Sequence, residues 1–299
     1  MKHVVSISLG SSRRNHSVEM EFAGEQCRVE RIGTDGDMAK MVQMIKELDG
    51  KVDCFGLGGM DLYAWAGEKR YMIRDAKKVA RAASKTPMVD GSGLKNTLER
   101  QAIFYLDRET DILKGKKQVL MTSAADRYGM AISLTELGFQ VTFGDLLYLL
   151  KLPFPINSLK TLQTVVKIIA PAAVLLPFKF LYPTGEKQHE SVPKFAQYFD
   201  RADVIAGDFH LIRRNMPPRL PGKVIITNTT TKEDVVYLKE AGVSTLVTTT
   251  PELEGRSFGT NVMEALLVAL AGKKEELSGE EYLHWIKELH FIPRIEKLN

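Results

Sequence analysis

Cysteine is scarce in this chain, because the 299 residues include only Cys27 and Cys54. Two cysteines provide neither a disulfide framework nor a thiolate metal site, so we expect no metal site. The net charge of +4 is small, and lysine and arginine form no dense stripe with aromatic residues between them. We therefore expect no nucleic-acid partner, and the scarcity of cysteine favours a cytoplasmic location.

A long uninterrupted apolar segment is also lacking. The most apolar region, 165–182, contains Lys167, Lys179, Pro171 and Pro177. A membrane-spanning helix needs about 20 mostly apolar residues, so we expect no membrane span. A helical pair that is broken at Pro171, buried in the fold or in a homodimer interface, is the simpler interpretation.

Signatures of several enzyme classes are missing as well. The chain contains no His-Glu-x-x-His motif, no Gly-x-Ser-x-Gly motif and no P-loop lysine. These absences remove the support for a zinc peptidase, an α/β-hydrolase or a P-loop nucleotidase.

What the chain does contain is an alternation of strand and helix patterns, which predicts an α/β fold with mostly parallel sheets. A polar stretch, Thr110–Lys117, is typical of a domain boundary. We predict three parts: an α/β substrate domain (1–113), a Rossmann-like, doubly wound nucleotide domain (114–273) with an apolar helical insert (147–182), and a C-terminal helix (274–299) that packs back on the fold.

Residues 118–145 carry the pattern of a dinucleotide-binding unit: a strand, a turn of small residues, a helix and a second strand. Small residues in the turn, Ser123 and Ala124, let backbone N–H groups approach a pyrophosphate at the helix start. Gly129 allows close packing of the helix on the sheet. Asp145, at the end of the second strand, is placed to bind a ribose 2′-hydroxyl, which favours NAD over NADP.

The turn departs from the usual glycine-rich pattern. Asp126 adds negative charge that would repel a phosphate, although Arg127 could offset this charge and pair with the phosphate. The alternative is an ordinary strand–helix–strand crossover in which Asp126 caps the helix.

The C-terminal half, 223–272, resembles the closing half of the shikimate and quinate dehydrogenase family. Ala241-Gly242 matches the turn that ends one helix, and Gly259 opens the helix that faces substrate and nicotinamide in that family. Asn261 or Glu264 is the nearest counterpart of the family's substrate-contacting glutamine. The resemblance implies an NAD(P)-dependent oxidoreductase that transfers hydride at a hydroxyl or carbonyl carbon of a small polar, carboxylated substrate.

The same resemblance implies a lysine and an aspartate that face the oxidised hydroxyl. Here Asp90 and Lys95 lie at a helix start, and a solvated helix start is the alternative for them. His210 follows another strand and could act as an acid or base near neutral pH. Other polar residues at strand or loop ends are candidates for cofactor or substrate contacts: Thr227 and Asn228 for the cofactor, and Arg213 and Arg256 for an anionic substrate group.

Two further functions remain open from the sequence alone. One is a non-enzymatic protein that binds or senses a nucleotide or metabolite, which the degenerate turn around Asp126 favours. The other is a reductase for an acyl or lipid-like substrate, which the apolar region 147–182 favours.

Overall fold

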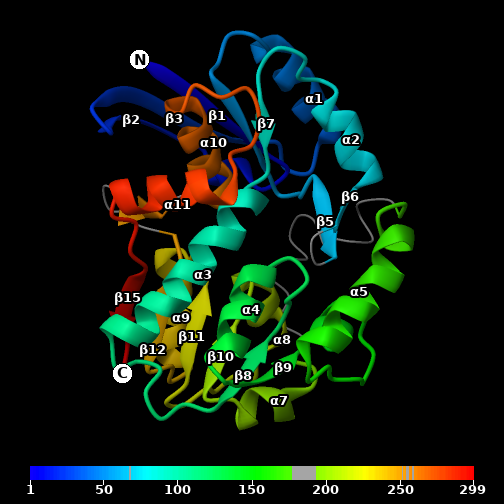
Figure 1. Cartoon of the computed structure of the whole chain (residues 1–299), viewed down its shortest axis with the longest axis vertical. Coiled ribbons are helices and arrows are strands. Elements are labelled where there is room, and N and C mark those ends of the chain that lie inside the picture. Colours follow the sequence, from blue (N-terminus) through cyan, green and yellow to red (C-terminus); the bar gives the residue numbers. More distant parts are fainter. Residues whose placement is uncertain (67–68, 177–192, 251, 254–255, 258) are drawn as a thin grey trace. The chain divides into compact units, whose positions relative to one another are not determined.

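The computed structural model describes residues 1–66, 69–176, 193–250, 252–253, 256–257 and 259–299. The chain forms two compact units (Figure 1). Unit 1 comprises Met1–Thr97, Ile169–Lys187 and Gly259–His290, and unit 2 comprises Leu98–Ile168, Gln188–Phe258 and Phe291–Asn299. Both units are built on parallel strands, which confirms the predicted α/β class.

The sheet of unit 1 has five strands in the order β2-β3-β1-β4-β7. All pairs are parallel except the β2–β3 hairpin. Ala23 and Gly24 form the hairpin turn with φ angles of 49° and 77°, as a two-residue turn with the right-handed strand twist requires. The strands are β1 (Lys2–Ser8), β2 (His16–Phe22), β3 (Glu25–Gly33), β4 (Cys54–Gly58) and β7 (Met88–Val89).

Helices cover both faces of this sheet. Met41 and Ile45 of α1 (Met38–Leu48) and Val79 of α2 (Arg74–Ala80) pack with Ile7 and Leu57 in one core. The opposite face receives α10 (Thr260–Leu270), whose backbone would lie only 2.7 Å from a Cβ atom at Gly56. The remaining elements of unit 1 are a short helix (Ser12–Arg14), β5 (Tyr63–Ala66), β6 (Lys69–Met72) and α11 (Gly279–Glu288).

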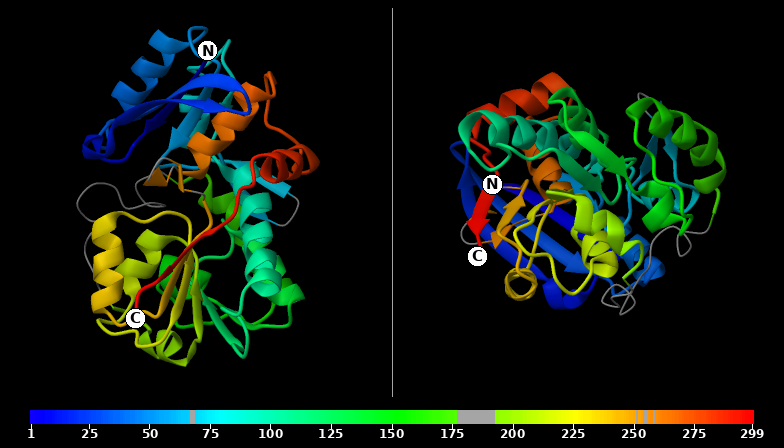
Figure 2. Two further views of the ribbon diagram at one scale, coloured as in Figure 1. Left: turned by 90° about the vertical axis from the view of Figure 1, so that its left-hand side faces the viewer. Right: turned by 90° about the horizontal axis from the view of Figure 1, so that it is seen from below.

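The sheet of unit 2 has the order β15-β12-β11-β10-β8-β9. The central pairs are parallel, and only β15, which lies along β12 near the C-terminus (Figure 2), is antiparallel. The chain leaves β8 for β9 on one side and returns to β10 on the other, as in doubly wound folds. The strands are β8 (Gln118–Met121), β9 (Gln140–Phe143), β10 (Val204–Ala206), β11 (Val224–Thr227), β12 (Thr245–Thr248) and β15 (Arg294–Lys297).

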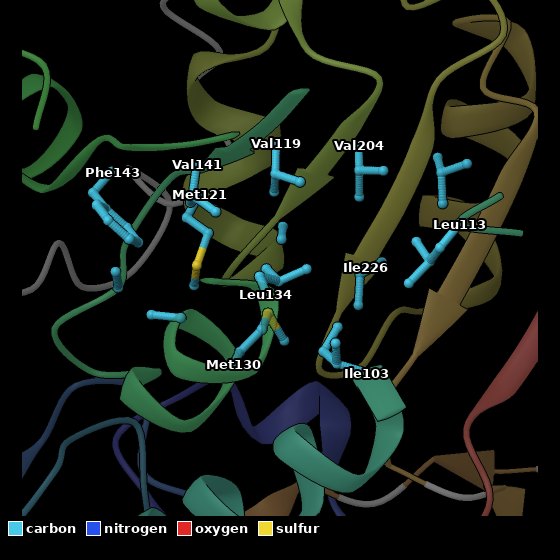
Figure 3. Packing of buried hydrophobic residues seen from close by; sticks show 14 of the residues in the cluster. Ile103, Leu113, Val119, Met121, Met130, Leu134, Val141, Phe143, Val204 and Ile226 are labelled. Atoms are coloured by element: carbon cyan, nitrogen blue, oxygen red, sulfur yellow. The ribbon is translucent and has the colours of Figure 1, made fainter. Parts of the chain in front are cut away.

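Alternate residues of these strands enter two cores. Val119 and Met121 pack with Met130 and Leu134 of α4 (Figure 3), whereas Leu120 packs with helices on the opposite face. The first core is covered by α3 (Ser92–Glu109), α4 (Tyr128–Glu136) and α5 (Leu159–Ala173), and the second by α7 (Ala196–Arg201), α8 (Phe209–Asn215) and α9 (Lys232–Glu240). Two short strands, β13 (Glu252–Leu253) and β14 (Arg256–Ser257), and a one-turn π-helix, η2 (Asp145–Leu149), complete the unit.

The structure differs from the sequence-based expectations in four places. The predicted C-terminal helix, 274–299, ends at Glu288, and the strand β15 follows it. Residues 259–290 belong to unit 1 because α10 packs on β1 and β4, so the predicted second domain, 114–273, does not coincide with unit 2. The helix expected to break at Pro171 continues to Ala173, since a proline in the last turn removes only one late backbone hydrogen bond. Within the predicted insert, residues 177–182 lie outside the described residues.

The sequence predicts neither a membrane span nor a metal site, and both concern the described part of the chain. None of its helices is long and apolar enough to cross a membrane. Its histidine, cysteine and acidic side chains form no group of three that could hold a metal ion.

Candidate functional site

The loops at the carboxyl ends of β8 and β10 form the candidate site of unit 2. We call residues 122–127, after β8, and 207–208, after β10, the switch-point loops. The connections from β8 and β10 run to opposite sides of the sheet, so these two loops diverge. Open parallel sheets bind ligands at this position.

Helix α4 follows the first of these loops and begins without a side-chain cap. Its N-cap residue is Arg127, and no side-chain hydrogen bond to the helix start is found in the described part of the chain. The first N–H groups of a helix have no partner within the helix. Those of Tyr128, Gly129 and Met130 are therefore suited to an anion.

Asp145, directly after β9 and Gly144, binds the turn that precedes α4. Its carboxylate accepts the backbone N–H groups of Ala124 at 3.0 Å and Ala125 at 2.9 Å. The side chain is buried, and burial raises the pKa of Asp145 to about 6 despite these two hydrogen bonds. Asp145 thus fixes the turn, and its predicted contact with a ribose stays a prediction.

Arg127 is buried among carboxylates. Its guanidinium group pairs with Glu99 on α3 and, at 3.2 Å, with Asp208 after β10. Arg127 and Glu99 are almost completely inaccessible to solvent. Asp126 lies 3.8 Å from the same guanidinium group. The positive charge that the sequence suggested for a phosphate is therefore already balanced by three acids, and the ion pairs join α3 to both switch-point loops.

Thr227 and Asn228 extend this network to the end of β11. The Thr227 hydroxyl donates to the Gly207 carbonyl at 2.8 Å, and the Asn228 amide donates to Asp208 at 3.2 Å. Asp208 also caps α8 by accepting the N–H of His210 at 2.9 Å. The structure thus brings Thr227 and Asn228 to the switch-point loops, and their contacts with a cofactor stay a prediction.

Unit 1 has its own polar cluster at the carboxyl edge of its sheet. The ammonium group of Lys95 on α3 lies 3.7 Å from the carboxylate of Asp61, which follows β4. Asp90 instead accepts the N–H of Ser92 at 2.9 Å and that of Leu62 at 2.5 Å. Asp90 therefore shapes the start of α3, and Asp61 is a carboxylate close to the predicted catalytic lysine.

Glu264 on α10 is the most buried acid of this cluster. Its Oε1 atom accepts the Tyr282 hydroxyl, and its Oε2 atom has no hydrogen-bond partner in the described part of the chain. Burial, followed by the charge of Asp90, raises the pKa of Glu264 to about 8. Asn261, one turn earlier, donates its amide to the Ser6 hydroxyl at 2.7 Å, and Gly259 is the N-cap residue of α10.

The other predicted site residues lie in unit 2. His210 is the second residue of α8. Arg213 pairs with Asp234 and stacks over the Tyr237 ring at 4.8 Å, so it joins α8 to α9. Arg256 lies in β14, and its side chain is outside the described residues. The substrate contacts proposed for these arginines stay predictions.

Glu99 and Asp61 are the acids whose roles sequence reasoning missed. Glu99 is four residues after Lys95 on α3, and Asp61 follows the Gly58-Gly59 pair. A charged residue on the apolar side of a helix is a signal that could have identified Glu99, since buried acids are rare unless paired.

Two family models match consecutive parts of the chain. A family model described as a domain of unknown function (DUF8754) matches residues 93–298. A second one, described as a domain of unknown function (DUF8753), matches residues 3–90. A search of curated proteins gives no match.

Solved structures show only distant likeness. NAD-dependent malic enzyme from Thermotoga maritima is 13% identical, with 96% of this chain and 84% of that chain covered and a TM-score of 0.35. A galactofuranose-binding protein is 10% identical, with 97% and 100% covered and a TM-score of 0.36. A Mycobacterium smegmatis protein in complex with β-D-fucofuranose is 11% identical, with 100% of both chains covered and a TM-score of 0.34. These low TM-scores leave the functional conclusion to the residues of the chain itself.

Proposed function

The chain belongs to the family described as a domain of unknown function (DUF8754), and we propose that it is an NAD(P)-dependent oxidoreductase. Unit 2 binds the dinucleotide at the switch-point loops, with NAD preferred over NADP. The substrate is a small polar molecule with a hydroxyl or carbonyl carbon, of the kind that shikimate and quinate dehydrogenases use.

The observation that carries this proposal is the uncapped start of α4 at the switch point. Helices α1, α8, α9 and α11 begin with a side-chain cap, whereas α2, α7 and α10 lack one, as α4 does. Of these uncapped helices, α4 is the one that begins at the switch point of unit 2. At α4 the N–H groups instead remain for a ligand. The pyrophosphate of a dinucleotide is an anion that fits such a helix start.

Asp145 is compatible with this role. The two N–H groups that it accepts belong to Ala124 and Ala125, which precede α4, so the first N–H groups of the helix itself stay available. A carboxylate has about four acceptor positions, and the remaining ones could accept a ribose hydroxyl. A 2′-phosphate would meet the negative charge of Asp145, which favours NAD.

Lys95 and Asp61 supply the acid–base group. A buried lysine beside a carboxylate can exchange a proton with a substrate hydroxyl while the carboxylate holds the ammonium group in place. The nicotinamide, when bound, accepts or donates the hydride. The residues of the chain bind and orient the substrate, and Lys95 transfers the proton.

Thermal unfolding with NAD, NADP and ADP-ribose tests the proposal. A ligand at one hundred times its dissociation constant stabilises a protein by about 2.7 kcal/mol. Removing the negative charge beside α4 with Asp126→Asn should tighten ADP-ribose binding about two- to fivefold. Asp111→Asn is the matched control, because its side chain is 90% exposed in unit 2. No stabilisation by any of the three ligands at millimolar concentration would exclude a dinucleotide site.

A second function is favoured by the balanced charges in the switch-point loops. Arg127 is neutralised by Glu99, Asp208 and Asp126, and Asp145 accepts hydrogen bonds from two backbone N–H groups of the turn. Such a site suits a neutral, hydroxyl-rich metabolite that is bound without reaction. Stabilisation by a sugar or polyol, with no response to NAD, NADP or ADP-ribose, would establish this binding role instead.

A further inference from the structure

A cationic loop lies at the carboxyl edge of the unit 1 sheet. We call residues 9–15, which connect β1 to β2, the β1 loop. It carries Arg13 and Arg14, both exposed, and it contacts the half-buried Arg31 near the end of β3. Within the described part of the chain, none of these three arginines forms an ion pair with a carboxylate.

Arg31 is fixed by hydrogen bonds to the β1 loop and to the end of β1. Its Nη1 atom donates to the Ser11 carbonyl at 3.1 Å, and its Nη2 atom donates to the Ser8 hydroxyl at 3.2 Å. A guanidinium group has five N–H donors, so three donors of Arg31 remain for a ligand. None of its nitrogen atoms is buried without a partner, and these donors therefore reach solvent.

Arg14 is brought close to Arg31 by a shared acceptor. The backbone N–H of Arg14 donates at 3.3 Å to the Ser11 carbonyl, the same oxygen that accepts from Arg31. His16, two residues later, lies directly opposite Arg31 in the β2–β3 pair. Burial, followed by the charge of Arg14, lowers the pKa of Arg31 to about 10. An anion bound here relieves the repulsion between the two arginines.

Backbone contacts hold the β1 loop in place before any ligand binds. The N–H of Thr34 donates to the Ser8 carbonyl at 2.8 Å, and the N–H of Gly33 donates to the Asn15 side chain at 2.6 Å. A Cβ atom at Gly33 would lie only 2.5 Å from the Ser11 carbonyl oxygen, so glycine lets the loop approach the end of β3. A loop that is already ordered loses little conformational entropy when it binds a ligand.

The charge of this edge matches a dianion. Asp35 is the acid that contacts the β1 loop, because its carboxylate accepts the N–H of Ser12 at 2.7 Å. Three arginines and this one aspartate leave a net charge of +2. A phosphate monoester carries a charge of about −1.5 to −2 at pH 7 and has three strong acceptor oxygens. A carboxylate carries a single charge, so it balances only half of this excess.

We propose that unit 1 binds the phosphate group of a small phosphorylated metabolite between the β1 loop and the end of β3. Arg31 donates to two phosphate oxygens, as its planar guanidinium group allows, and Arg13 and Arg14 supply further positive charge. This site is formed by unit 1 alone, and it does not rest on dinucleotide binding at the switch-point loops of unit 2.

Isothermal titration of the full chain with phenyl phosphate and benzoate tests the site. The two probes share an aromatic ring and differ in the anionic group. We expect phenyl phosphate to bind about tenfold more tightly than benzoate or better. Arg31→Gln should weaken phenyl phosphate binding about tenfold or more, since it removes a charged donor pair. Arg14→Gln should weaken it about two- to fivefold, because an exposed cation contributes less.

Arg81→Gln is the matched control, because Arg81 is another exposed arginine of unit 1. It should bind phenyl phosphate as the unaltered chain does. Hydrogen exchange locates the site: phenyl phosphate should slow the exchange of residues 9–15 in the unaltered chain and in Arg81→Gln, but not in Arg31→Gln.

Two kinds of result would overturn the phosphate site. One is the absence of phenyl phosphate binding at millimolar concentration, or equal binding of benzoate. The other is unchanged binding in both Arg31→Gln and Arg14→Gln, or an equal loss in Arg81→Gln, which would indicate general attraction to a basic surface. Arg14→Gln decides the question if Arg31→Gln does not fold, because the Arg14 side chain makes no hydrogen bond within the described residues.

Discussion

Replacing Glu264 by glutamine should remove a large pH dependence from the stability of unit 1. Glu264 is 1% exposed, and the Tyr282 hydroxyl donates to its Oε1 atom. The substitution keeps a carbonyl oxygen for this hydrogen bond. It removes only the ability to ionise, so the comparison isolates the cost of a buried negative charge.

The sign and size follow from the pKa of Glu264, which burial raises from 4.5 to about 8. Between pH 4.5 and about 8, Glu264 is protonated in the folded chain and ionised in the unfolded chain. The contribution of the protonated Glu264 to the free energy of unfolding is therefore complete below pH 4.5. It is lost as the pH rises toward 8. The rise in pKa from 4.5 to about 8 corresponds to a loss of about 3 kcal/mol at pH 7, about 4 kcal/mol at pH 8 and about 5 kcal/mol at higher pH. These values are upper limits because local rearrangement would relieve part of the penalty.

Tryptophan fluorescence during urea unfolding measures this effect selectively. Both tryptophans of the chain, Trp65 and Trp285, belong to unit 1. We expect Glu264→Gln to be more stable than the unaltered chain at pH 8, with the difference vanishing near pH 4.5. Glu280→Gln is the control, because Glu280 is exposed on α11. The reasoning fails if Glu264→Gln and the unaltered chain show the same slope of stability against pH.

Two further changes probe the switch-point loops. Burial raises the pKa of Asp145 from 3.8 to about 6, so its contribution to stability is complete below pH 3.8 and falls by up to about 3 kcal/mol as the pH rises to 6. Asp145→Asn should abolish this fall, as measured by hydrogen exchange of unit 2 at several pH values; an unchanged pH profile would contradict the assignment. Glu99→Ala should destabilise unit 2 by about 3 kcal/mol because Arg127 stays buried with fewer counter-charges. Thermal unfolding should show recovery in Glu99→Leu/Arg127→Leu, and equal losses in both variants would mean that packing, not charge, explains the effect.

Most of the fold was predictable because its signals are local. The alternation of Val119, Leu120 and Met121 between two cores is the ordinary period of a strand. The two-residue turn at Ala23-Gly24 is likewise encoded in neighbouring residues. The strand β15 was missed because its four residues, Arg294–Lys297, alternate only between half-buried and exposed positions. It is held by pairing with β12, which no local pattern reveals.

The sequence could indicate where the candidate site lies, but not which charged residues pair with one another there. Parallel strands bring their carboxyl ends to one edge, so the sequence could place Thr227 and Asn228 there. The partners of the charged residues come from distant segments. Glu99 and Arg127 are paired across α3 and the β8 loop, and Asp61 and Lys95 across a strand end and a helix. A single sequence contains no signal for such pairs.

Both units place one of their own carboxylates where the sequence suggested an external anion. In unit 2, Asp145 accepts the turn N–H groups of Ala124 and Ala125. In unit 1, Glu264 reaches the glycine-rich start of α3, where its Oε1 atom would lie 2.6 Å from a Cβ atom at Gly93. Small residues at these turns therefore admit an internal acid as readily as a ligand. The two turns still differ, because the start of α4 keeps N–H groups that Asp145 does not reach, and we therefore expect an external anion at the turn before α4 rather than at the start of α3.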